Sequence, residues 1–520
     1  MSERRRIGIF GWGVVAPRSR NIEAFTENLA SSESWLSAFD GYGPSNFLVG
    51  KPDFDLTDYA GWISERFPPA RFKQIDQKMG TPTKYAIGAF VQSLSQNPGI
   101  EQYLQELGPL AHVYVGTGLG DLPTFYDESV RLHHALEEWS AFWANPERNE
   151  ALREHLDGGG SFTPPADPQT LSSDERAAAQ MEWNSYWTDE SRELQRYLEE
   201  IREIEGMSVE GDVEKGKGAL LRRKQARTRE LRERWGCPIE PWNQVSANVL
   251  WNIHSTPASQ ISMLGKITGM TFAPVAACST FGYALKLAKS AIETGEATAV
   301  VVGATDPVPH GISVGSFYAA RVIAADGVVS KPLTGLRGTH ISGGSTVWII
   351  GDYDVLTAKG FQPLGMEPVG IGVTADADHI ITPTPEGPTA AIQRAFTDAA
   401  AEPKELTSWD LHATATPGDY LEVETARKIC GENVLFTARK GTFGHGMGVC
   451  GGWELLAQYL GYTHGTIYPT PLQRDDLNPI IGNVHDRFAY LEGIPAEPGL
   501  AGKLSMGVGG INVCVLSRPW

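Results

Sequence analysis

The stretch FAPVAACSTFGYALKLAKSAIETGEATAVVVGATD, residues 272–306, places a cysteine at the junction of two kinds of local structure. Cys278 follows a short apolar run that is typical of a buried strand. After it, apolar residues recur at steps of four, three and four, which predicts one face of a helix ending at Gly295. These residues are Phe281, Leu285, Ala288 and Ile292. Cys278 therefore lies at the helix amino end, where unpaired N–H groups favour a thiolate. This segment alone fits a nucleophile and a buried structural cysteine about equally well.

Composition places the 520-residue chain among ordinary globular proteins, with enough material for two to four domains. The net charge of −18 argues against nucleic-acid binding and against binding to anionic membranes, because phosphates are repelled on average. No run of about 18 apolar residues predicts membrane insertion. The opening MSERRRIGIFGWG is too short in its apolar part for a signal peptide. Five cysteines without metal-type spacing indicate reduced thiols, and hence a cytoplasmic protein.

Strand-like and helix-like segments alternate along most of the chain. Short apolar runs predict strands at 7–16, 111–116, 297–303, 345–356, 364–373 and 503–520. Apolar residues at helical spacing predict helices at 83–97, 387–401 and 419–429. This alternation predicts an α/β fold with mainly parallel sheets that are covered on both faces.

The middle of the chain, about 121–245, differs in composition and reads as a helical insertion. Segments 189–206 and 217–235 predict exposed helices with many oppositely charged pairs at i, i+4 spacing. The second helix carries a basic cluster: Arg222, Arg223, Lys224, Arg227, Arg229, Arg232 and Arg234. This cluster fits either a dock for an acidic carrier or a solvated helix face with partial self-pairing. We favour the second interpretation, because charge runs are usually solvated faces.

Two later segments place histidines in turns rich in small residues. In DLHATATPGDYLE (410–422), His412 follows an apolar run and precedes Thr414 and Thr416. In KGTFGHGMGVCGGWEL (440–455), Lys440 and His445 lie in a glycine-dense turn that leads into a helix. Glycines permit close backbone approach and positive φ angles. Two such histidines together with a cysteine at a helix end favour a catalytic site over a structural one.

These motifs together resemble those of the β-ketoacyl synthases, the condensing enzymes of the thiolase-fold superfamily. The nucleophile motif of the family is matched by AACSTFGYAL (276–285) and its His-Gly-Thr-x-Thr motif by HATAT (412–416). The Lys-x-x-x-Gly-His motif is matched by KGTFGHGMGVCGG (440–452), and the carboxy-terminal glycine turn by GVGGIN (507–512). The motifs occur in the order of the family, and the likeness covers about 7–120 and 246–518.

The resemblance implies a five-layered α-β-α-β-α thiolase fold built from two related halves. We divide them as 1–310, which includes the insertion at 121–245, and 311–520. The implied activity is decarboxylative Claisen condensation of a cysteine-bound acyl group with a malonyl-type thioester, in fatty-acid-type or polyketide-type synthesis. The implied partners are an acyl carrier protein, acyl and malonyl thioesters on phosphopantetheine, and a second chain, normally in a homodimer, with a heterodimer as the other possibility. No cofactor and no metal is implied.

Residue roles follow from the matched motifs. Cys278 is the expected nucleophile, and neutral His412 and His445 are expected to stabilise the enolate that decarboxylation leaves. Lys440 is expected to orient the site.

The substrate contacts follow in the same way. Thr414 and Thr416 are expected to hydrogen-bond the pantetheine arm. The backbone N–H groups of Cys278 and Val508 are expected to form the oxyanion hole. Val508 also stands where many relatives carry a gating phenylalanine, so the acyl pocket is expected either to admit bulkier chains or to lose ordered gating.

The chain departs from the family pattern at two further places. Ala413 stands where the family usually has glycine. In SKPLTGLRGTHISGGST (330–346), Gly343 or Gly344 occupies the place that we assign to the acidic partner of the active-site lysine. Lys440 is therefore expected to lack its usual salt-bridge partner.

Three alternatives remain at this stage. A related acyltransferase would pass the acyl group to oxygen, nitrogen or sulfur. A degenerate subunit would shape chain length in a heterodimer without catalysing the reaction. A dinucleotide-binding oxidoreductase is prompted by GTGLGD (116–121), but this stretch lacks the G-x-G-x-x-G spacing and a clear acidic partner for the ribose.

Overall fold

The computed structural model describes residues 5–43, 46–208, 213–380 and 384–520. The chain forms two compact units. The first runs to Thr124 and resumes at Leu250, and the second is Phe125–Val249.

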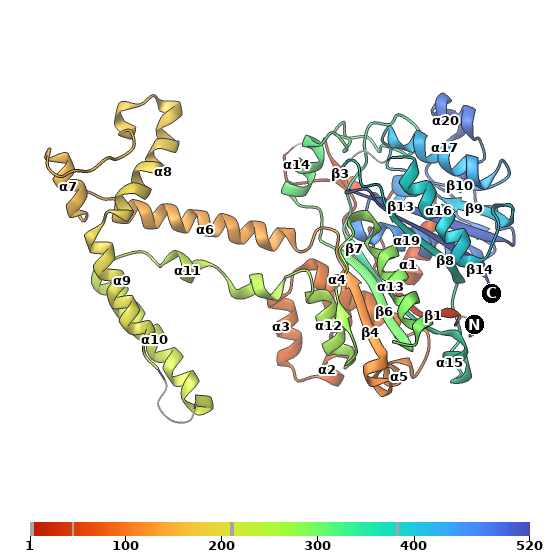
Figure 1. The fold of residues 1–520 in the computed structure, drawn as a ribbon, viewed down its shortest axis with the longest axis horizontal. Helices are drawn as coiled ribbons and strands as arrows, with labels where there is room; N and C mark the ends of the chain where they lie inside the picture. Colours follow the sequence, from red (N-terminus) through yellow and green to blue (C-terminus); the bar gives the residue numbers. More distant parts are fainter. Residues whose placement is uncertain (1–4, 44–45, 209–212, 381–383) are drawn as a thin grey trace. The chain divides into compact units, whose positions relative to one another are not determined.

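The first unit contains two five-stranded sheets (Figure 1). The first sheet has the order β1 (Ile7–Val15), β7 (Gly344–Asp352), β6 (Ala299–Asp306), β4 (Ala111–Gly116), β5 (Thr271–Phe272). The second has the order β8 (Met366–Ala375), β14 (Ile511–Pro519), β13 (Leu500–Gly507), β9 (Leu406–Asp410), β10 (Leu435–Thr437). Two short ribbons pair β2 (Ser37–Ala38) with β3 (Leu48–Val49), and β11 (Thr466–Ile467) with β12 (Ile494–Pro495).

The two five-stranded sheets repeat one topology. In each sheet, the strand that comes first in the chain lies at the edge and pairs antiparallel with the strand that comes last in the chain. That last strand also pairs antiparallel with the strand that precedes it in the chain, and the other neighbouring strands pair in parallel. The sheets are therefore mixed, and the prediction of mainly parallel sheets is only half right. Strands change from the first sheet to the second between Asp352 and Met366, later than the predicted division at residues 310 and 311.

Helices cover both sheets in layers, as the resemblance implied. The buried helices α13 (Thr280–Thr294) and α19 (Cys450–Thr463) share one hydrophobic core with strands of both sheets and so lie between them (Figure 1). Helices α4 (Thr81–Ser93) and α12 (Thr256–Gly265) pack on the outer face of the first sheet. Helices α16 (Glu386–Ala399) and α17 (Gly418–Cys430) pack on the outer face of the second. The result is the five-layered α-β-α-β-α arrangement.

The remaining helices of this unit are shorter. They are α1 (Ile22–Leu29), α2 (Ala60–Arg66), α3 (Ala70–Lys78), α5 (Ile100–Glu106), α14 (Gly311–Ala319), α15 (Tyr353–Ala358), α18 (Lys440–Phe443) and α20 (Pro479–Val484). The strand predicted over 345–356 ends early, because the Asp352 side chain accepts the amide of Val355 and caps α15.

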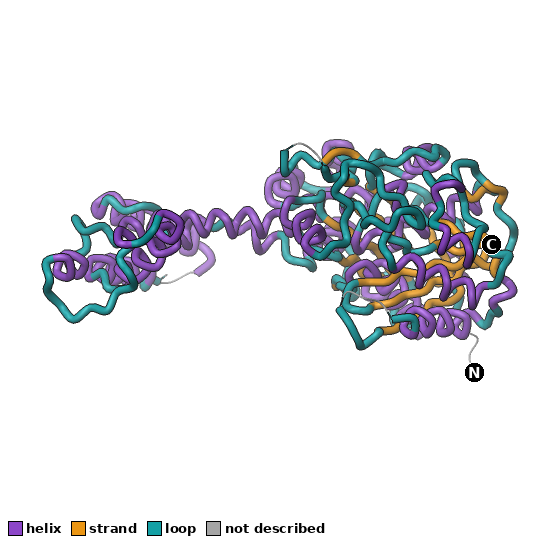
Figure 2. The backbone as a smooth tube through the Cα atoms, turned by 90° about the horizontal axis from the view of Figure 1, so that it is seen from above, coloured by secondary structure: helices purple, strands orange, loops and turns teal. Residues whose placement is uncertain are grey.

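The second unit consists of helices joined by loops (Figure 2). They are α6 (Leu122–Trp143), which begins in the first unit, α7 (Glu150–Leu156), α8 (Ser173–Asp189), α9 (Arg192–Glu205), α10 (Val213–Trp235) and α11 (Pro241–Gln244). The predicted helices at 189–206 and 217–235 correspond to α9 and α10. The unit has a core of its own, in which Trp139, Trp143 and Tyr197 pack together.

The basic cluster of α10 pairs in part with neighbouring acids. Lys224 pairs with Glu205 at 3.0 Å, Arg234 pairs with Glu200, and Arg232 lies 3.7 Å from buried Glu240. This arrangement agrees with the interpretation of a partly self-paired helix face.

Candidate active site

A tight turn holds Cys278 at the start of α13. The 3₁₀ turn Ala277–Ser279 leads directly into the helix, and Ala277 adopts a left-handed φ of 46°. The Ser279 hydroxyl donates to the carbonyl of Ile511 at 2.8 Å and lies 3.2 Å from that of Ser505. These contacts fasten the turn to the β13–β14 hairpin of the second sheet. The predicted inner face of the helix is fully buried, and the helix ends at Gly295 as predicted.

Two backbone amides approach the Cys278 sulfur. The amide of Val508, in the turn between β13 and β14, and the amide of Cys278 itself hydrogen-bond the sulfur. The adjoining Gly507 packs so closely that a Cβ there would lie 3.0 Å from the Ala276 carbonyl oxygen. The absence of a side chain at 507 thus lets the turn pack closely against the segment that carries Cys278. The Val508 side chain is 48% exposed.

Burial has the largest effect on the pKa of the Cys278 thiol. It raises the pKa of the thiol to about 11, although Lys440 and the Val508 amide act in the opposite direction, and Asp306 adds to the rise. Burial therefore opposes the thiolate that the helix end is expected to favour. Cys278 is a protonated thiol at neutral pH.

The two predicted histidines lie against each other. The His412 and His445 rings are 5.3 Å apart between centroids and nearly perpendicular, at 82°. His412 follows β9 and His445 follows α18. Burial, and then the charge of Lys440, lower the pKa of both imidazoles well below the usual 6.5. Both rings are therefore neutral at physiological pH.

Lys440 joins this pair and sets the tautomer of one ring. Its ammonium group donates to the backbone carbonyl of His412 and lies 3.4 Å from Nδ1 of that ring. Because a lysine only donates, Nδ1 of His412 acts as acceptor and its proton resides on Nε2. The Nε2–H group is then free to donate to a substrate oxygen.

The expectation that Lys440 lacks an acidic partner is wrong. Glu454 accepts from Lys440 at 2.8 Å, and both groups are buried. Burial alone would lower the pKa of Lys440, but Cys450 and Glu454 raise it, so the lysine is charged. The partner comes from α19, the helix after His445, and not from 330–346. It was present in the quoted stretch CGGWEL, where a lone glutamate interrupts the apolar face of a buried helix.

Two carboxylates of α17 hold the backbone after His412, and sequence reasoning missed both roles. Glu422 accepts the amides of His412 and Ala413 at 2.5 and 2.7 Å. Asp419 accepts the amide of Thr414 at 2.8 Å. Burial raises the pKa of Glu422 to about 8 and that of Asp419 to about 6. Both residues lie in the stretch GDYLE (418–422), where two acidic residues directly follow the motif that contains His412.

Thr414 and Thr416 lie in this same loop. Their hydroxyls are 2.9 Å apart, and both residues are half-buried. The loop thus presents a pair of hydroxyls directly after His412.

Asp306, at the end of β6, fastens the loops around the sulfur. It accepts the amides of Gly118, Leu119 and Gly448 at 2.8–2.9 Å. Burial raises its pKa to about 7, against the effect of these amides. The glycine-rich stretch 116–121 therefore binds a carboxylate of its own chain.

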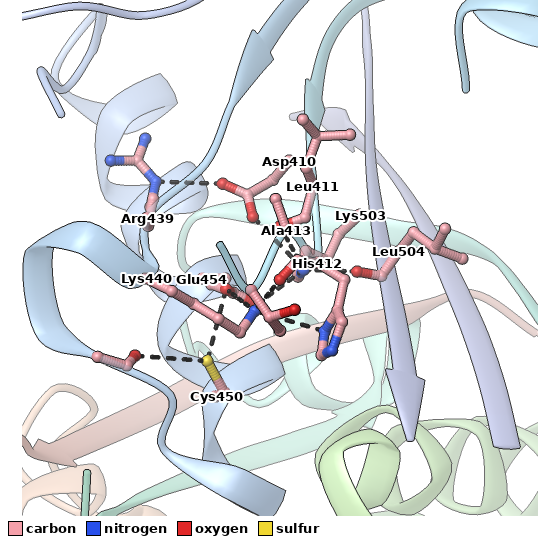
Figure 3. Close-up of polar contacts among 12 residues, drawn as sticks. Asp410, Leu411, His412, Ala413, Arg439, Lys440, Cys450, Glu454, Lys503 and Leu504 are labelled. Carbon is pink, nitrogen blue, oxygen red and sulfur yellow. Dashed lines mark hydrogen bonds and ion pairs between the residues drawn. The ribbon is translucent and has the colours of Figure 1, made fainter. Parts of the chain in front are cut away.

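A buried ion network lies beside His412 (Figure 3). We use this term for Asp410, Arg439, Lys440, Glu454 and Lys503, all of which are at most 2% exposed. Glu454 lies between two lysines, with Lys503 2.7 Å from its second oxygen. Asp410 lies 3.2 Å from Arg439 and 3.5 Å from Lys503. Apart from Lys440, no member of the network was predicted.

Lys440 thus contacts His412, acts electrostatically on His445 and on Cys278, and the Val508 amide hydrogen-bonds the Cys278 sulfur. Within the described ranges, no group of three or more His, Cys, Asp or Glu side chains is placed to hold a metal ion. No described helix is both long and apolar enough to span a bilayer. All five cysteines are free thiols and buried.

Comparison with known proteins gives matches in two segments of the chain. The family "Beta-ketoacyl synthase, N-terminal domain" matches residues 224–347, and "Beta-ketoacyl synthase, C-terminal domain" matches 367–473. "Nodulation protein E" of Rhizobium meliloti is 27% identical over 226 residues, 42% of this chain and 56% of that protein. "3-oxoacyl-[acyl-carrier-protein] synthase 2" of Staphylococcus aureus is 31% identical over 222 residues, 41% of this chain and 55% of that protein. The chain thus spans about half the length of these curated relatives.

Solved structures match over nearly the whole fold. A β-ketoacyl synthase from Burkholderia phymatum STM815 superposes with a TM-score of 0.67 at 17% identity, covering 99% of this chain and 100% of that chain. A structure titled "The ishigamide ketosynthase/chain length factor" superposes with a TM-score of 0.66 at 17% identity, covering 100% of both chains. At such low identity these matches establish the fold.

Proposed function

The chain belongs to the β-ketoacyl synthase family, and from that premise we propose that it joins two acyl thioesters by decarboxylative Claisen condensation. The observation that carries the proposal is the convergence of Cys278, two neutral imidazoles and Lys440 from both sheets on one buried site. The products belong to fatty-acid-type or polyketide-type synthesis.

The first step is transfer of an acyl group to Cys278. The sulfur attacks the thioester carbonyl, a new S–C bond forms, and the bond to the carrier sulfur breaks. The thiol proton leaves with the carrier, which is released as a thiol, so no net proton is consumed. The amides of Cys278 and Val508 stabilise the oxyanion, and loss of one such donor typically lowers the rate about 10²–10³-fold.

The second step forms the carbon–carbon bond. A malonyl-type thioester loses CO₂, and the electron pair of the broken bond becomes an enolate. Neutral His412 and His445 donate N–H groups to the enolate oxygen. The enolate carbon attacks the acyl carbonyl, the S–C bond to Cys278 breaks, and the sulfur takes up one proton from solvent. Lys440 holds His412 in the tautomer that this donation requires.

The substrate arm and the acyl chain use the remaining predicted residues. Thr414 and Thr416 hydrogen-bond the pantetheine arm that enters beside His412. The side chain of Val508 forms the edge of the acyl pocket, and its small size admits bulky chains. The chemistry balances without metal or redox cofactor, since the substrates arrive on phosphopantetheine.

We assign the carrier as an acyl carrier protein, which the name of the Staphylococcus aureus relative supports. The proposed assembly is a homodimer. A heterodimer is the alternative, which the ishigamide ketosynthase/chain length factor structure supports. A cytoplasmic location fits the five free cysteines.

Intact-mass measurement tests the proposal. The purified full-length protein is incubated with a panel of acyl-carrier thioesters and should gain the mass of one acyl group. Cys278→Ala should gain none, while the matched control Cys430→Ala, which removes a buried cysteine on α17, should be acylated normally. His445→Ala should be acylated but should not release CO₂ from a malonyl thioester.

Other outcomes identify the alternatives. Acylation of Cys278→Ala would refute the nucleophile. Acylation followed by transfer to an oxygen, nitrogen or sulfur nucleophile, without CO₂ release, would identify a related acyltransferase. A Cys278 that no thioester labels would identify a non-catalytic chain-length partner.

A further inference from the structure

A second buried lysine, Lys503, lies in the ion network but belongs to none of the matched motifs. It lies on β13 and is 1% exposed. Its ammonium group lies 2.7 Å from Glu454 and 3.5 Å from Asp410. It also donates to the backbone carbonyls of Leu411 and Leu504, at 3.3 and 2.5 Å. Four oxygen atoms therefore surround one cation, and none of them belongs to solvent.

These oxygens belong to segments that carry the proposed site. Leu411 is the residue immediately before His412, and Asp410 precedes it on β9. Glu454 is the partner of Lys440 and lies on α19. Lys503 itself lies on the strand that leads to Val508. One ammonium group thus ties the strand before His412 to the helix after His445 (Figure 3).

We propose that Lys503 is a positioning residue for the condensation step: by sharing Glu454 with Lys440 and holding the Leu411 carbonyl, it fixes His412 and His445 in register with the enolate. The inference rests on the proposed function and adds to it a residue outside the family motifs. Lys503 contacts two carboxylates and two backbone carbonyls, so it acts through the residues it holds.

The electrostatics of the site agree with this role. The charge of Lys503 contributes, after burial and Lys440, to lowering the pKa of both His412 and His445. The groups that act on the Cys278 thiol are instead Lys440, Asp306 and two backbone amides. Removing the Lys503 charge should therefore affect the histidines and leave the acylation step unchanged.

The test compares Lys503→Met with the wild type in the full-length protein. The enzyme is first acylated with an acyl-carrier thioester, and then mixed with a malonyl-carrier thioester in single turnover. The acylation rate should be unchanged, while the rate of CO₂ release should fall by about 10²-fold, as for a misplacement of about 1 Å. Loss of a nearby cation should also raise the imidazole pKa values, so the acidic limb of the condensation rate should move to higher pH.

The matched control is Lys289→Met. Lys289, on α13, is also a buried, ion-paired lysine, 3.2 Å from Asp398 on α16, but it lies outside the ion network. This control should leave acylation, condensation and the pH profile as in the wild type. An equal loss of condensation in the control would overturn the proposal, because any buried lysine would then serve.

A charge-balanced double variant addresses folding. Lys503→Met leaves Asp410 with less compensation, and removing one member of a buried pair is strongly destabilising. Lys503→Met/Asp410→Asn removes one charge of each sign, and should fold, acylate and still fail to condense. Unchanged condensation, equal loss of acylation and condensation, or loss of the fold in both variants would overturn the inference. A wild type that does not condense would instead overturn the proposed function.

Discussion

At the scale of single residues, burial decides which form of each side chain is present. The same loss of solvation that keeps His412 and His445 neutral keeps Cys278 protonated. A neutral imidazole donates to an enolate without adding a full charge, and a buried thiol is protected from premature reaction. In the proposed reaction, the incoming thioester therefore meets a protonated sulfur and not a resting thiolate.

The pH dependence of alkylation tests this view of Cys278. With a thiol pKa of about 11, the labelling rate at this cysteine by iodoacetamide should rise about tenfold per pH unit from pH 7 to about pH 10. The labelling rate rises with pH because only the thiolate reacts with iodoacetamide and the thiolate fraction grows with pH. Peptide-level mass spectrometry follows the rate. A plateau already reached near pH 7 would contradict the assignment, since it would indicate a resting thiolate.

Sequence motifs locate the residues of the proposed active site but not the residues that support them. Cys278, His412, Lys440 and His445 were predicted because each lies in a short, ordered pattern. Glu454 and Lys503 were not, since a single charged residue in a buried helix or strand gains its meaning only when the fold brings its partner near. Lys440 was expected to lack an acidic partner because the place of that partner was assigned to 330–346, whereas Glu454 lies on α19.

At the scale of elements, the apolar spacing of α13 predicts which face of the helix is packed in the core. Its residues at steps of four, three and four form the face that packs between the two sheets. The helix and its glycine end were predictable from spacing alone. The end of β7 was not predictable in this way. The Asp352 side chain accepts the amide of Val355 and starts a helix there, although apolar residues continue through 345–356.

Two leucines of α13 give a matched test of this packing. Leu285→Ala should lower the free energy of unfolding by about 2–5 kcal/mol, because it leaves a cavity between the sheets. Leu287→Ala on the same helix should cost little, since Leu287 is 40% exposed. Urea titration of both variants measures the difference. Equal losses would show that the predicted face is not the packed one.

At the scale of the whole molecule, the repeat of strand order in the two sheets was not visible in the sequence. It is defined by which strands pair, and pairing between residues far apart leaves no local pattern. The resemblance supplied the two halves, while the change of sheet between Asp352 and Met366 emerged only from the pairing of β7 with β1 and β6.

The second unit should fold without the first, because its aromatic core is internal. A fragment of residues 125–249 should give helical circular dichroism and unfold cooperatively in urea. Trp139, 6% exposed, lies in this core, so Trp139→Ala should destabilise the fragment by about 3–5 kcal/mol. Trp242→Ala, at a site 53% exposed, is the control and should cost much less. A fragment without helical signal would show that the unit depends on the rest of the chain.

The duplicated sheets have one more consequence. The sulfur of Cys278 is supplied by the first copy of the topology, whereas both imidazoles and Lys440 are supplied by the second. Cutting the backbone in the connection from β7 to β8 would leave each piece with an incomplete set of reacting groups. Recovery of turnover on mixing the pieces would then be a direct reporter of their reassociation.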